Sequence, residues 1–354
     1  MIVDKLVRNP GSWLSRDENV RIVMSSRVRL ARNLRGMPFP LQARQDENES
    51  ICKQVQMACD GVVALSSPVF MDMGQLDPVD KSVLRERHLI SSELAEKGAG
   101  SGLMLVEDEH SAIMINEEDH LRLQCIAPGG DLYSVWQRVD KVDSELEKLL
   151  DYAFSPRLGY LTACPSNVGT GLRASVMMHL PGLQLAGLID GVVRGLSKIG
   201  LAVRGLFGEG SQACGNMYQV SNQVTLGLSE QQIIERLASV VGEVTQHERN
   251  ARQRLLEGQR ALVMDRIGRA FGILSHAWLL SSDEMVELLS ILRMGIEFGL
   301  VTGTTVPIVN EVMLTTQPGH LQKISGKALG TVERDEMRGQ IARDRLKDMN
   351  LRAE

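Results

Sequence analysis

Residues 164–175 form a short segment in which a thiol, two glycines, small hydroxyl groups and a guanidinium follow one another closely. Cys164 stands at its head and Arg173 near its end. Glycine frees the backbone, so such a loop can bring N–H groups and an arginine up to an anion. The segment does not fit GxxxxGK[ST] or GxGxxG, which excludes a P-loop and a Rossmann phosphate loop. On these residues alone, a phosphate-binding loop and an ordinary glycine-rich surface loop are both open.

A second segment, residues 25–33, alternates arginines with apolar side chains. On a strand, Arg27 and Arg29 would project from one face and their apolar neighbours from the other. Two permanently charged planar forks on one face suit phosphate oxygens. A solvated basic edge is the alternative interpretation.

A third segment, residues 112–125, predicts a hairpin with an acidic tip. The apolar run 112–115 indicates one strand, the polar run 116–119 a connection, and the alternation that follows a return strand. Side chains of the return strand would alternate between its two faces. The apolar face would carry Leu121, Leu123 and Cys125, and the opposite face His120, Arg122 and Gln124. The acids at the tip are Glu117, Glu118 and Asp119. A solvated acidic turn is again the alternative.

Taken together, these segments resemble the phosphagen kinase superfamily, whose members phosphorylate guanidino groups from ATP. The matching patterns are S-S-R-V-R-x-x-R-N at 25–33, N-E-E-D-H-x-R at 116–122 and C-P-S-N-x-G-T-G-x-R-A-S at 164–175. Three ordered motifs are far more specific than one. The resemblance continues through 86–91 and 203–211, and the run A-S-V-M-M-H-L-P at 174–181 is typical of the Gram-positive branch that acts on protein arginine.

Composition sets outer limits on the function. The chain has 354 residues, of which 43% are hydrophobic, and a net charge of −5, so no global basic field indicates direct nucleic-acid binding. Its five cysteines are odd in number and form no CxxC, which disfavours a disulfide framework or a zinc site and fits a reducing cytoplasm. No apolar run reaches the roughly 18 residues of a membrane span, and no signal-peptide core follows the N-terminus. We therefore expect a soluble cytoplasmic protein without a membrane partner.

Hydrophobic periodicity predicts the elements that must hold these segments. Helices are expected within 1–20, 46–65, 142–150, 183–199, 229–244, 261–301 and 333–351, and strands at 103–106, 112–115 and 219–228. Ser229 and Gln232 form a predicted capping box for the long helix. Alternation favours an antiparallel sheet flanked by helices. The predicted fold is α+β, with a phosphagen-kinase-like catalytic domain at 1–255 and a helical domain at 256–354, which the resembled family uses to dimerise.

The resemblance implies an ATP site in which arginines hold phosphate oxygens and Mg²⁺ bridges the phosphates without side-chain ligands. Phe207 stands where small-guanidine kinases have a further arginine, a departure that the protein-arginine branch shares. The positions implied to contact nucleotide are Ser25, Ser26, Arg27, Val28, Arg29, His88, Arg122, Arg173, Ala174, Ser175, Val176, Met177, Arg204, Phe207, Gly208, Glu209, Gly210 and Ser211.

Attack by a guanidinium requires removal of a proton from a group whose pKa is about 12 or higher, and a carboxylate can both orient the fork and take the proton. By resemblance Glu118 is this base, while Glu117 and Asp119 support the turn. Gln212 stands where the family has a second glutamate, so slower turnover than in a Gln212→Glu variant is expected. Cys164 is implied to be a structural or activating thiol, and redox sensitivity is equally open. The other four cysteines are expected to be buried.

Two further features bear on substrate and regulation. The first ATP motif begins at Ser25, leaving no room for the helical N-terminal domain that closes over small guanidines, so an acceptor site open to protein arginine is expected. Near the C-terminus, Arg334, Asp335 and Arg338 resemble the R-D-x-x-R-A motif that forms an allosteric phosphoarginine pocket, with Gly339 in place of alanine. A solvated charged helix is the alternative.

The expected function is ATP-dependent phosphorylation of exposed arginine side chains in proteins. By resemblance this would mark them for a Clp-type protease, inactivate a heat-shock repressor in the stress response, and involve an activator or adaptor protein and a homodimer. Two alternatives stay open: a kinase for a small guanidine, and a catalytically weakened phosphoarginine-binding regulator, which Gln212 keeps possible.

Overall fold

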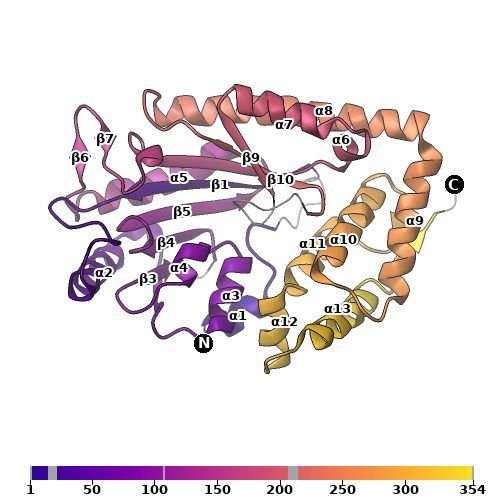
Figure 1. Ribbon diagram of the computed structural model, residues 1–354, viewed down its shortest axis with the longest axis horizontal. Helices are drawn as coiled ribbons and strands as arrows, with labels where there is room; N and C mark the ends of the chain where they lie inside the picture. Colours follow the sequence, from indigo (N-terminus) through magenta and orange to yellow (C-terminus); the bar gives the residue numbers. More distant parts are fainter. Residues whose placement is uncertain (1, 15–21, 107, 206–213, 353–354) are drawn as a thin grey trace. The chain divides into compact units, whose positions relative to one another are not determined.

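The computed structural model describes residues 2–14, 22–106, 108–205 and 214–352 (Figure 1). The chain divides into two compact units. We call residues 25–176 and 221–239 the sheet unit, and residues 1–24, 177–220 and 240–354 the helix-rich unit. This division does not follow the predicted boundary near residue 255, because the chain passes between the units more than once; the two-domain scheme stays a prediction.

The sheet unit is built on antiparallel strands in the order β2-β3-β4-β5-β1, followed by β8 and β10, which contribute to both units. Figure 1 shows β1, β5 and β4 as neighbouring strands. The strand bounds are β1 (Val23–Arg32), β2 (Val69–Asp72), β3 (Gly102–Leu105), β4 (Ser111–Ile115), β5 (Leu121–Pro128), β8 (Leu172–His179) and β10 (Met217–Asn222). In the helix-rich unit the order β8-β10 continues to β9 (Leu201–Gly205). The predicted antiparallel sheet is confirmed.

The register of β1 against β5 explains the two faces of this sheet. Val28 pairs with Cys125 and Leu30 with Leu123, and all four side chains are at most 1% exposed. Paired residues lie on the same face of a sheet, so this apolar face is the buried one. The helix α5 (Leu132–Leu146) packs on β5 with a buried stripe. The stripe consists of Val135, Val139, Val142 and Leu146.

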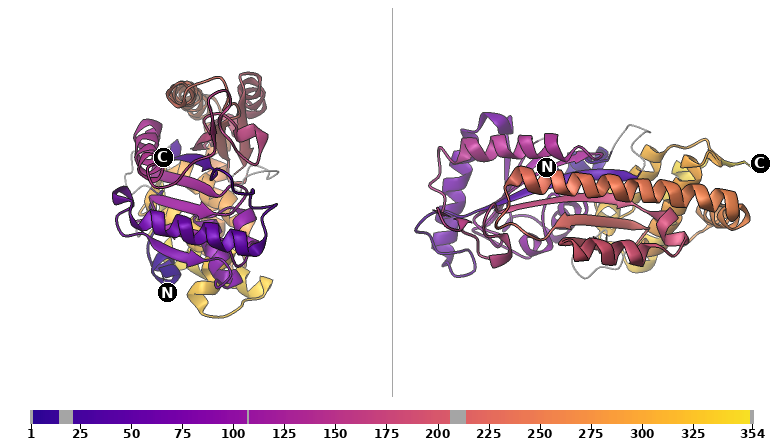
Figure 2. Two further views of the ribbon diagram at one scale, coloured as in Figure 1. Left: turned by 90° about the vertical axis from the view of Figure 1, so that its left-hand side faces the viewer. Right: turned by 90° about the horizontal axis from the view of Figure 1, so that it is seen from above.

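The rest of the sheet unit consists of short elements. They are α2 (Gln45–Asp60), η1 (Val63–Leu65), α3 (Pro78–Glu86), α4 (Ser92–Ala95), β6 (Phe154–Ser155), β7 (Gly159–Tyr160), η2 (Pro165–Asn167) and the first residues of α8 (Glu230–Gly258). The capping box is confirmed, because the Ser229 N–H donates to the Gln232 side chain (2.8 Å) and Gln232 N–H to Ser229 Oγ (3.2 Å). Figure 2 shows α8 as one long uninterrupted helix.

The helix-rich unit has a core in which α9, α10, α11 and α13 pack together. Its elements are α1 (Ile2–Arg8), α6 (Pro181–Leu185), α7 (Ile189–Lys198), most of α8, α9 (Arg260–His276), α10 (Ser282–Glu297), α11 (Val306–Thr315), α12 (Pro318–Ser325), α13 (Thr331–Arg345), β11 (Val301–Thr302) and β12 (Asn350–Leu351). The core includes Ile267, Leu274, Leu289, Leu292, Val309 and Ala342.

Several element predictions were wrong in extent. The helix expected at 142–150 is the end of α5, which begins at Leu132 and ends at Leu146. The expected single helix at 183–199 is interrupted at Gly187, whose φ of 68° is left-handed. The expected helix at 261–301 is two helices, α9 and α10, and the terminal helix ends at Arg345 rather than 351. The strand predicted at 219–228 ends at Asn222, and Val224 and Leu226 after it are exposed. Each of the other errors extended a periodic pattern across residues that change the chain direction.

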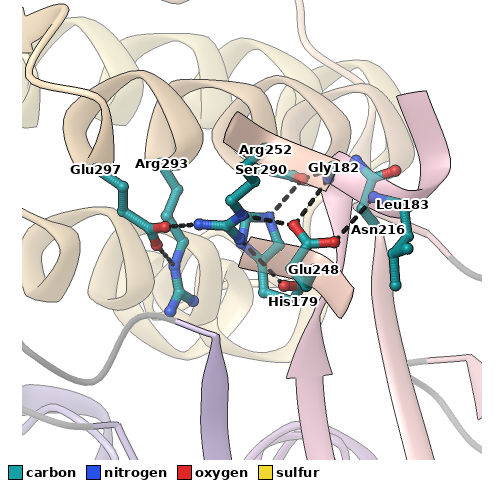
Figure 3. A network of polar contacts seen from close by, with 9 residues as sticks. All are labelled: His179, Gly182, Leu183, Asn216, Glu248, Arg252, Ser290, Arg293 and Glu297. Carbon is teal, nitrogen blue, oxygen red and sulfur yellow. Dashed lines mark hydrogen bonds and ion pairs between the residues drawn. The ribbon is translucent and has the colours of Figure 1, made fainter. Parts of the chain in front are cut away.

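Buried charges join α8 to α10 within the helix-rich unit (Figure 3). Arg252 pairs with Glu248 (Nε to Oε1, 2.5 Å) and with Glu297. The other contacts of Glu248 are backbone N–H groups, those of Gly182 (2.8 Å) and Leu183 (2.9 Å) at the start of α6. Because each charge has an opposite charge or N–H donors beside it, this cluster meets the requirement for burying ions in a core.

A neighbouring set of polar contacts centres on Ser290 of α10. Its Oγ accepts from Asn216 Nδ2 (2.8 Å) and lies 2.9 Å from His179 Nε2. Burial lowers the pKa of His179 well below its usual value, so this imidazole is neutral. The end of β8 and the start of β10 are thereby fastened to α10 (Figure 3).

Candidate active site

Four arginines of the sheet unit gather their charges around one face of the sheet. Arg27 and Arg29 lie on β1, Arg122 on β5 and Arg173 on β8. The register places Arg29 opposite Gln124 and Ala31 opposite Arg122, so the β1 and β5 arginines share the face opposite the apolar one. This arrangement matches the face assignment predicted for residues 27–30 and 120–125.

Electrostatics within this guanidinium cluster are unfavourable. Burial and the charges of Arg122 and Arg173 lower the pKa of Arg27 to about 10. Burial and the three other guanidinium groups hold the pKa of Arg29 well below its ordinary value. Within the described residues, neither Arg27 nor Arg29 forms an ion pair with a carboxylate, and Arg29 Nε is a buried donor without an acceptor. Buried donors that lack an acceptor indicate a binding site for an anion.

His88 lies beside the same cluster, two residues after the end of α3. Its φ of 60° is left-handed, and its carbonyl oxygen accepts from Gln124 Nε2 (2.7 Å). Burial, followed by the charges of Arg27 and Arg29, lowers the pKa of His88 to about 3. The imidazole is therefore neutral at physiological pH and adds hydrogen-bonding capacity without a fifth positive charge.

The hairpin between β4 and β5 carries the acids, as predicted. Glu117 is 1% exposed and pairs with Arg122 (Oε2 to Nη1, 2.5 Å). Asp119 Oδ1 accepts from Asn33 Nδ2 (2.6 Å) and Ala163 N–H (2.7 Å), so it anchors the turn. Glu118 is the acid left partly exposed, and burial raises its pKa against the opposing effect of Arg122. A carboxylate with a raised pKa beside cationic groups is suited to accept a proton.

The loop at 164–171 is held by Thr225 and by two close backbone approaches. Thr225 Oγ1 lies within hydrogen-bond distance of the carbonyl oxygens of Ser166 (2.9 Å) and Val168 (2.7 Å), which share its one hydrogen. A Cβ on Gly169 would come within 2.4 Å of Thr225 O, and one on Gly171 within 2.6 Å of Ala31 O. These glycines therefore allow close backbone packing at both positions.

Cys164 precedes η2 at the start of this loop and is partly exposed, with Sγ 3.0 Å from Ser166 Oγ. Cys52, Cys59 and Cys125 are buried, and burial raises the pKa of each of these thiols. Cys214 is only partly buried, so the prediction that it belongs with them was wrong.

The remaining predicted nucleotide positions lie in different surroundings. Val28, Ala174 and Val176 are fully buried, with Val28 on the apolar face, while Ser175 lies on β8 beside Arg173. Ser25, Ser26 and Met177 are each at most 8% exposed. The Oγ of Ser26 donates to Gly129 O (2.7 Å). Arg204 lies on β9 in the helix-rich unit. Phe207, Gly208, Glu209, Gly210, Ser211 and Gln212 lie outside the described residues.

The three residues of the predicted phosphoarginine pocket lie on α13. Arg338 is 2% exposed and donates to Thr316 O (3.0 Å), Leu280 O (2.6 Å) and Asp335 Oδ1 (2.6 Å). Arg334 donates to Leu329 O (2.7 Å). A Cβ on Gly339 would come within 2.6 Å of Trp278 O, so glycine lets the 277–280 connection lie against α13.

Sequence reasoning missed two buried polar residues next to the site. Arg32 pairs with Asp143 (2.6 Å), stacks 3.5 Å above the Tyr160 ring and donates to Thr170 O (2.9 Å). Asn222 bonds to backbone on both sides of Arg173. Arg32 stood in the first motif without an assigned role, and nothing in the sequence singled out Asn222.

The donor set fits a polyphosphate such as ATP. Among the described residues, Arg122 pairs with Glu117, Arg27 and Arg29 form no ion pair with a carboxylate, and the buried Nε of Arg29 has no acceptor. Arginine forks bind phosphate oxygens with two donors at a time. Within the described ranges, no group of three or more His, Cys, Asp or Glu side chains could hold a metal ion.

Comparisons with known proteins agree with this geometry. The family model for the ATP:guanido phosphotransferase C-terminal catalytic domain matches residues 50–251, and that for the protein-arginine kinase McsB C-terminal domain matches residues 260–354. A protein-arginine kinase of Halothermothrix orenii is 46% identical over 97% of this chain and 98% of its own. One of Pelotomaculum thermopropionicum is 44% identical over the same shares of the two chains.

Solved kinase structures share this fold. A lombricine kinase superposes with a TM-score of 0.59 at 27% identity, covering 71% of each chain. A duplicated taurocyamine kinase from Schistosoma mansoni, with bound components of a transition state analogue, gives 0.59 at 25% identity over 75% of this chain and 40% of its own. None of the described helices is long and apolar enough to cross a membrane. The chain is thus an enzyme of the ATP:guanido phosphotransferase family and belongs to its protein-arginine kinases.

Proposed function

We propose that this enzyme transfers the terminal phosphoryl group of ATP to arginine side chains of proteins. The observation that supports this most directly is the guanidinium cluster, in which the buried Nε of Arg29 has no acceptor among the described residues, flanked by the acidic hairpin that carries Glu118. The cluster supplies the positive charge that a phosphoryl transfer site needs. The names of the relatives, which cover nearly the whole chain, support protein arginine as the acceptor.

In this proposal Arg27, Arg29 and Arg173 bind phosphate oxygens, and Mg²⁺ arrives with the nucleotide. Glu118 takes a proton from the acceptor guanidinium, which frees a nitrogen lone pair. That nitrogen bonds to the terminal phosphorus while the bond from this phosphorus to the bridging oxygen breaks, leaving ADP. Glu117 holds Arg122 in place. Ser175, Arg204 and the segment with Phe207 and Gln212 are assigned to the site by the motif alone.

We also propose a biological role for this activity, which the motifs shared with protein-arginine kinases support. Arginine phosphorylation by this enzyme would mark proteins for a Clp-type protease and inactivate a heat-shock repressor in the cytoplasm, with an activator or adaptor as partner. Residues 256–354 would form the dimerisation domain, and Arg334, Asp335 and Arg338 the phosphoarginine pocket. Because Arg338 is bonded internally here, phosphoarginine would have to share or replace the contacts of Arg338 with carbonyl oxygens.

One assay tests the central proposal. The chain is incubated with ATP, Mg²⁺ and an unfolded basic protein, with free arginine in parallel, and acid-labile phosphate is located by mass spectrometry. Label on protein arginine alone supports the proposal, and label on free arginine alone supports the small-guanidine alternative. No label on either, with ATP still bound, would favour the phosphoarginine-binding regulator.

The Glu118→Gln variant tests the base. It keeps the shape of the side chain and removes its basicity, so turnover should fall by about a hundredfold or more while the Kd of ATP stays the same. Glu93→Gln is the matched control, since Glu93 is a neighbouring acid on α4 that also raises the pKa of Glu118. Equal losses in both variants would remove the special role of Glu118.

A further inference from the structure

Asn222 holds the backbone on both sides of Arg173. Its Oδ1 accepts from Ala174 N–H (2.8 Å), and its Nδ2 donates to Leu172 O (3.0 Å). The second hydrogen of Nδ2 donates to Val224 O (3.1 Å). Asn222 is 6% exposed, so these bonds form away from solvent and use both donors of the amide.

This contact replaces a rung of the sheet. β10 ends at Asn222, so beyond this point it offers β8 no further backbone partner. One side-chain amide supplies the acceptor and the donor that a continuing strand would have supplied. Because residues 172 and 174 are both tied down, the backbone at Arg173 is fixed and the direction of its side chain is set.

Two neighbours complete the support. Ser221 Oγ accepts from Arg173 Nη2 (3.3 Å), which holds the charged end of the side chain. On the preceding side, Arg32 Nη1 donates to Thr170 O (2.9 Å), two residues before the start of β8. Arg173 is therefore held at its backbone and at its guanidinium group.

Such support is needed because the cluster repels Arg173. Its charge lies close enough to act on Arg27 and Arg29, which carry the same sign. An arginine on a flexible backbone would turn away from like charges before a ligand arrived. A fixed backbone keeps this guanidinium in place in the ligand-free protein and so reduces the cost of ordering the site on binding.

We infer that Asn222 is a positioning residue for Arg173 and through it sets the affinity of the guanidinium cluster for nucleotide phosphates. The inference rests on the proposed function, since it assumes that the cluster binds ATP. It goes beyond that function by placing a determinant of affinity on a residue outside the motifs.

A double-mutant cycle tests the inference on the full chain. The Kd of ATP with Mg²⁺ is measured by calorimetry for the parent, Asn222→Ala, Arg173→Ala and the double variant, with kcat and the KM for ATP alongside. Asn222→Ala should weaken ATP binding by about tenfold. This is the size expected if Arg173 is displaced and loses about one hydrogen bond to a charged phosphate. In the Arg173→Ala background the same change should cost less than about twofold. A KM effect larger than the kcat effect is expected.

Equal fold-changes in both backgrounds would show that Asn222 acts on the fold rather than through Arg173, and would overturn the inference. So would an unchanged Kd in Asn222→Ala. Should that variant unfold, Asn222→Asp replaces it, because a carboxylate keeps the acceptor for Ala174 N–H and loses the donor to Leu172 O. Asn48→Ala is the control, a half-buried asparagine of the same unit whose Nδ2 donates to Pro40 O (3.2 Å).

The Kd of the parent measured by calorimetry also distinguishes a failure of the inference about Asn222 from a failure of the proposed function. If the parent binds ATP but labels no arginine, the proposed function fails and the cycle can still be read. If the parent binds no ATP, both fail together.

Discussion

Gly171 lies directly against Arg32. A Cβ on Gly171 would come within 2.7 Å of Arg32 Nη1 and 2.6 Å of Ala31 O, and its φ is 65°. The loop before Arg173 therefore runs over a buried ion pair formed by Arg32 and Asp143. Glycine at this position is required both by the backbone conformation and by the space that Arg32 occupies.

Gly171→Ala should accordingly destabilise the chain by about 2–4 kcal/mol, as strain at positive φ adds to the clash. Urea unfolding followed by circular dichroism measures this loss. Gly36→Ala is the control, because Gly36 has a similar φ of 75° and nothing within 4 Å of the added Cβ. It should cost only about 1 kcal/mol. Similar losses in both variants would show that the approach to Arg32 contributes nothing.

The comparison of Gly171 with Asn222 indicates what a sequence can predict here. Alternation in 27–30 and 121–125 correctly assigned side chains to faces, because one face of a sheet is buried and the pattern has period two. The motif placed Gly171 in a loop but could not show that Arg32 fills the space beside it. The role of Asn222 depends on where β10 ends, and that end was predicted six residues too late, at 228 rather than 222.

Long-range polar pairs are the other part that periodicity cannot supply. Arg32 and Asp143 are 111 residues apart in the chain, and each alone looks like an ordinary charged residue. The acids at the hairpin tip were found together because they are adjacent in sequence. Their different environments, Glu117 buried and paired and Glu118 partly exposed, emerged only from the fold.

Arg29→Met should stabilise the ligand-free chain and weaken its response to nucleotide. The variant removes a guanidinium that burial and three like charges disfavour, so the free energy of unfolding should rise by about 1 kcal/mol. Calorimetric Tm values with and without ADP measure both effects. The parent should gain more from ADP than the variant, because binding to the folded state stabilises by mass action.

Arg35→Met is the control for this experiment, since Arg35 is exposed and pairs loosely with Asp151 (3.4 Å). It should change neither the ligand-free Tm nor the gain from ADP by more than a small amount. A lower ligand-free Tm in Arg29→Met would contradict the conclusion that burial and repulsion from the other guanidinium groups make the charge of Arg29 unfavourable in the ligand-free protein.

His88 should make the protein sensitive to acid. Its pKa is about 3 in the folded chain against 6.5 for an unperturbed histidine, so below pH 6.5 the unfolded state binds a proton that the folded state does not. Titration of this residue therefore leaves the free energy of unfolding unchanged above pH 6.5 and lowers it as the pH falls towards 3. Between pH 7 and pH 5 the loss should be about 1–2 kcal/mol.

His88→Asn removes the titrating group and keeps a residue that tolerates the left-handed φ of 60°. Urea unfolding at pH 7 and pH 5 should show a smaller loss of stability for this variant than for the parent. An identical loss would mean that the imidazole is not the group responsible.

Arg252→Met should break the buried charge network of the helix-rich unit. It leaves Glu248 and Glu297 without a shared cation, which costs about 3–5 kcal/mol in a buried pair. Glu297 still pairs with Arg293 (Nε to Oε1, 3.4 Å), so the loss should lie towards the lower end of this range. Arg269→Met is the control, as its pair with Asp265 is exposed and should contribute about 0.5 kcal/mol or less.

Gln212→Glu should increase turnover. A glutamine keeps one acceptor oxygen for the acceptor guanidinium but has neither the charge to hold that cation nor the basicity to share its proton. Restoring the carboxylate should raise kcat for protein arginine by about tenfold, with little change in the Kd of ATP. Gln223→Glu, an exposed position near β10, introduces the same charge outside the motif and should leave kcat unchanged. If both variants leave turnover as it is, position 212 does not contact the acceptor. A gain at 212 alone would show that Glu118 has been working in this chain without its usual partner.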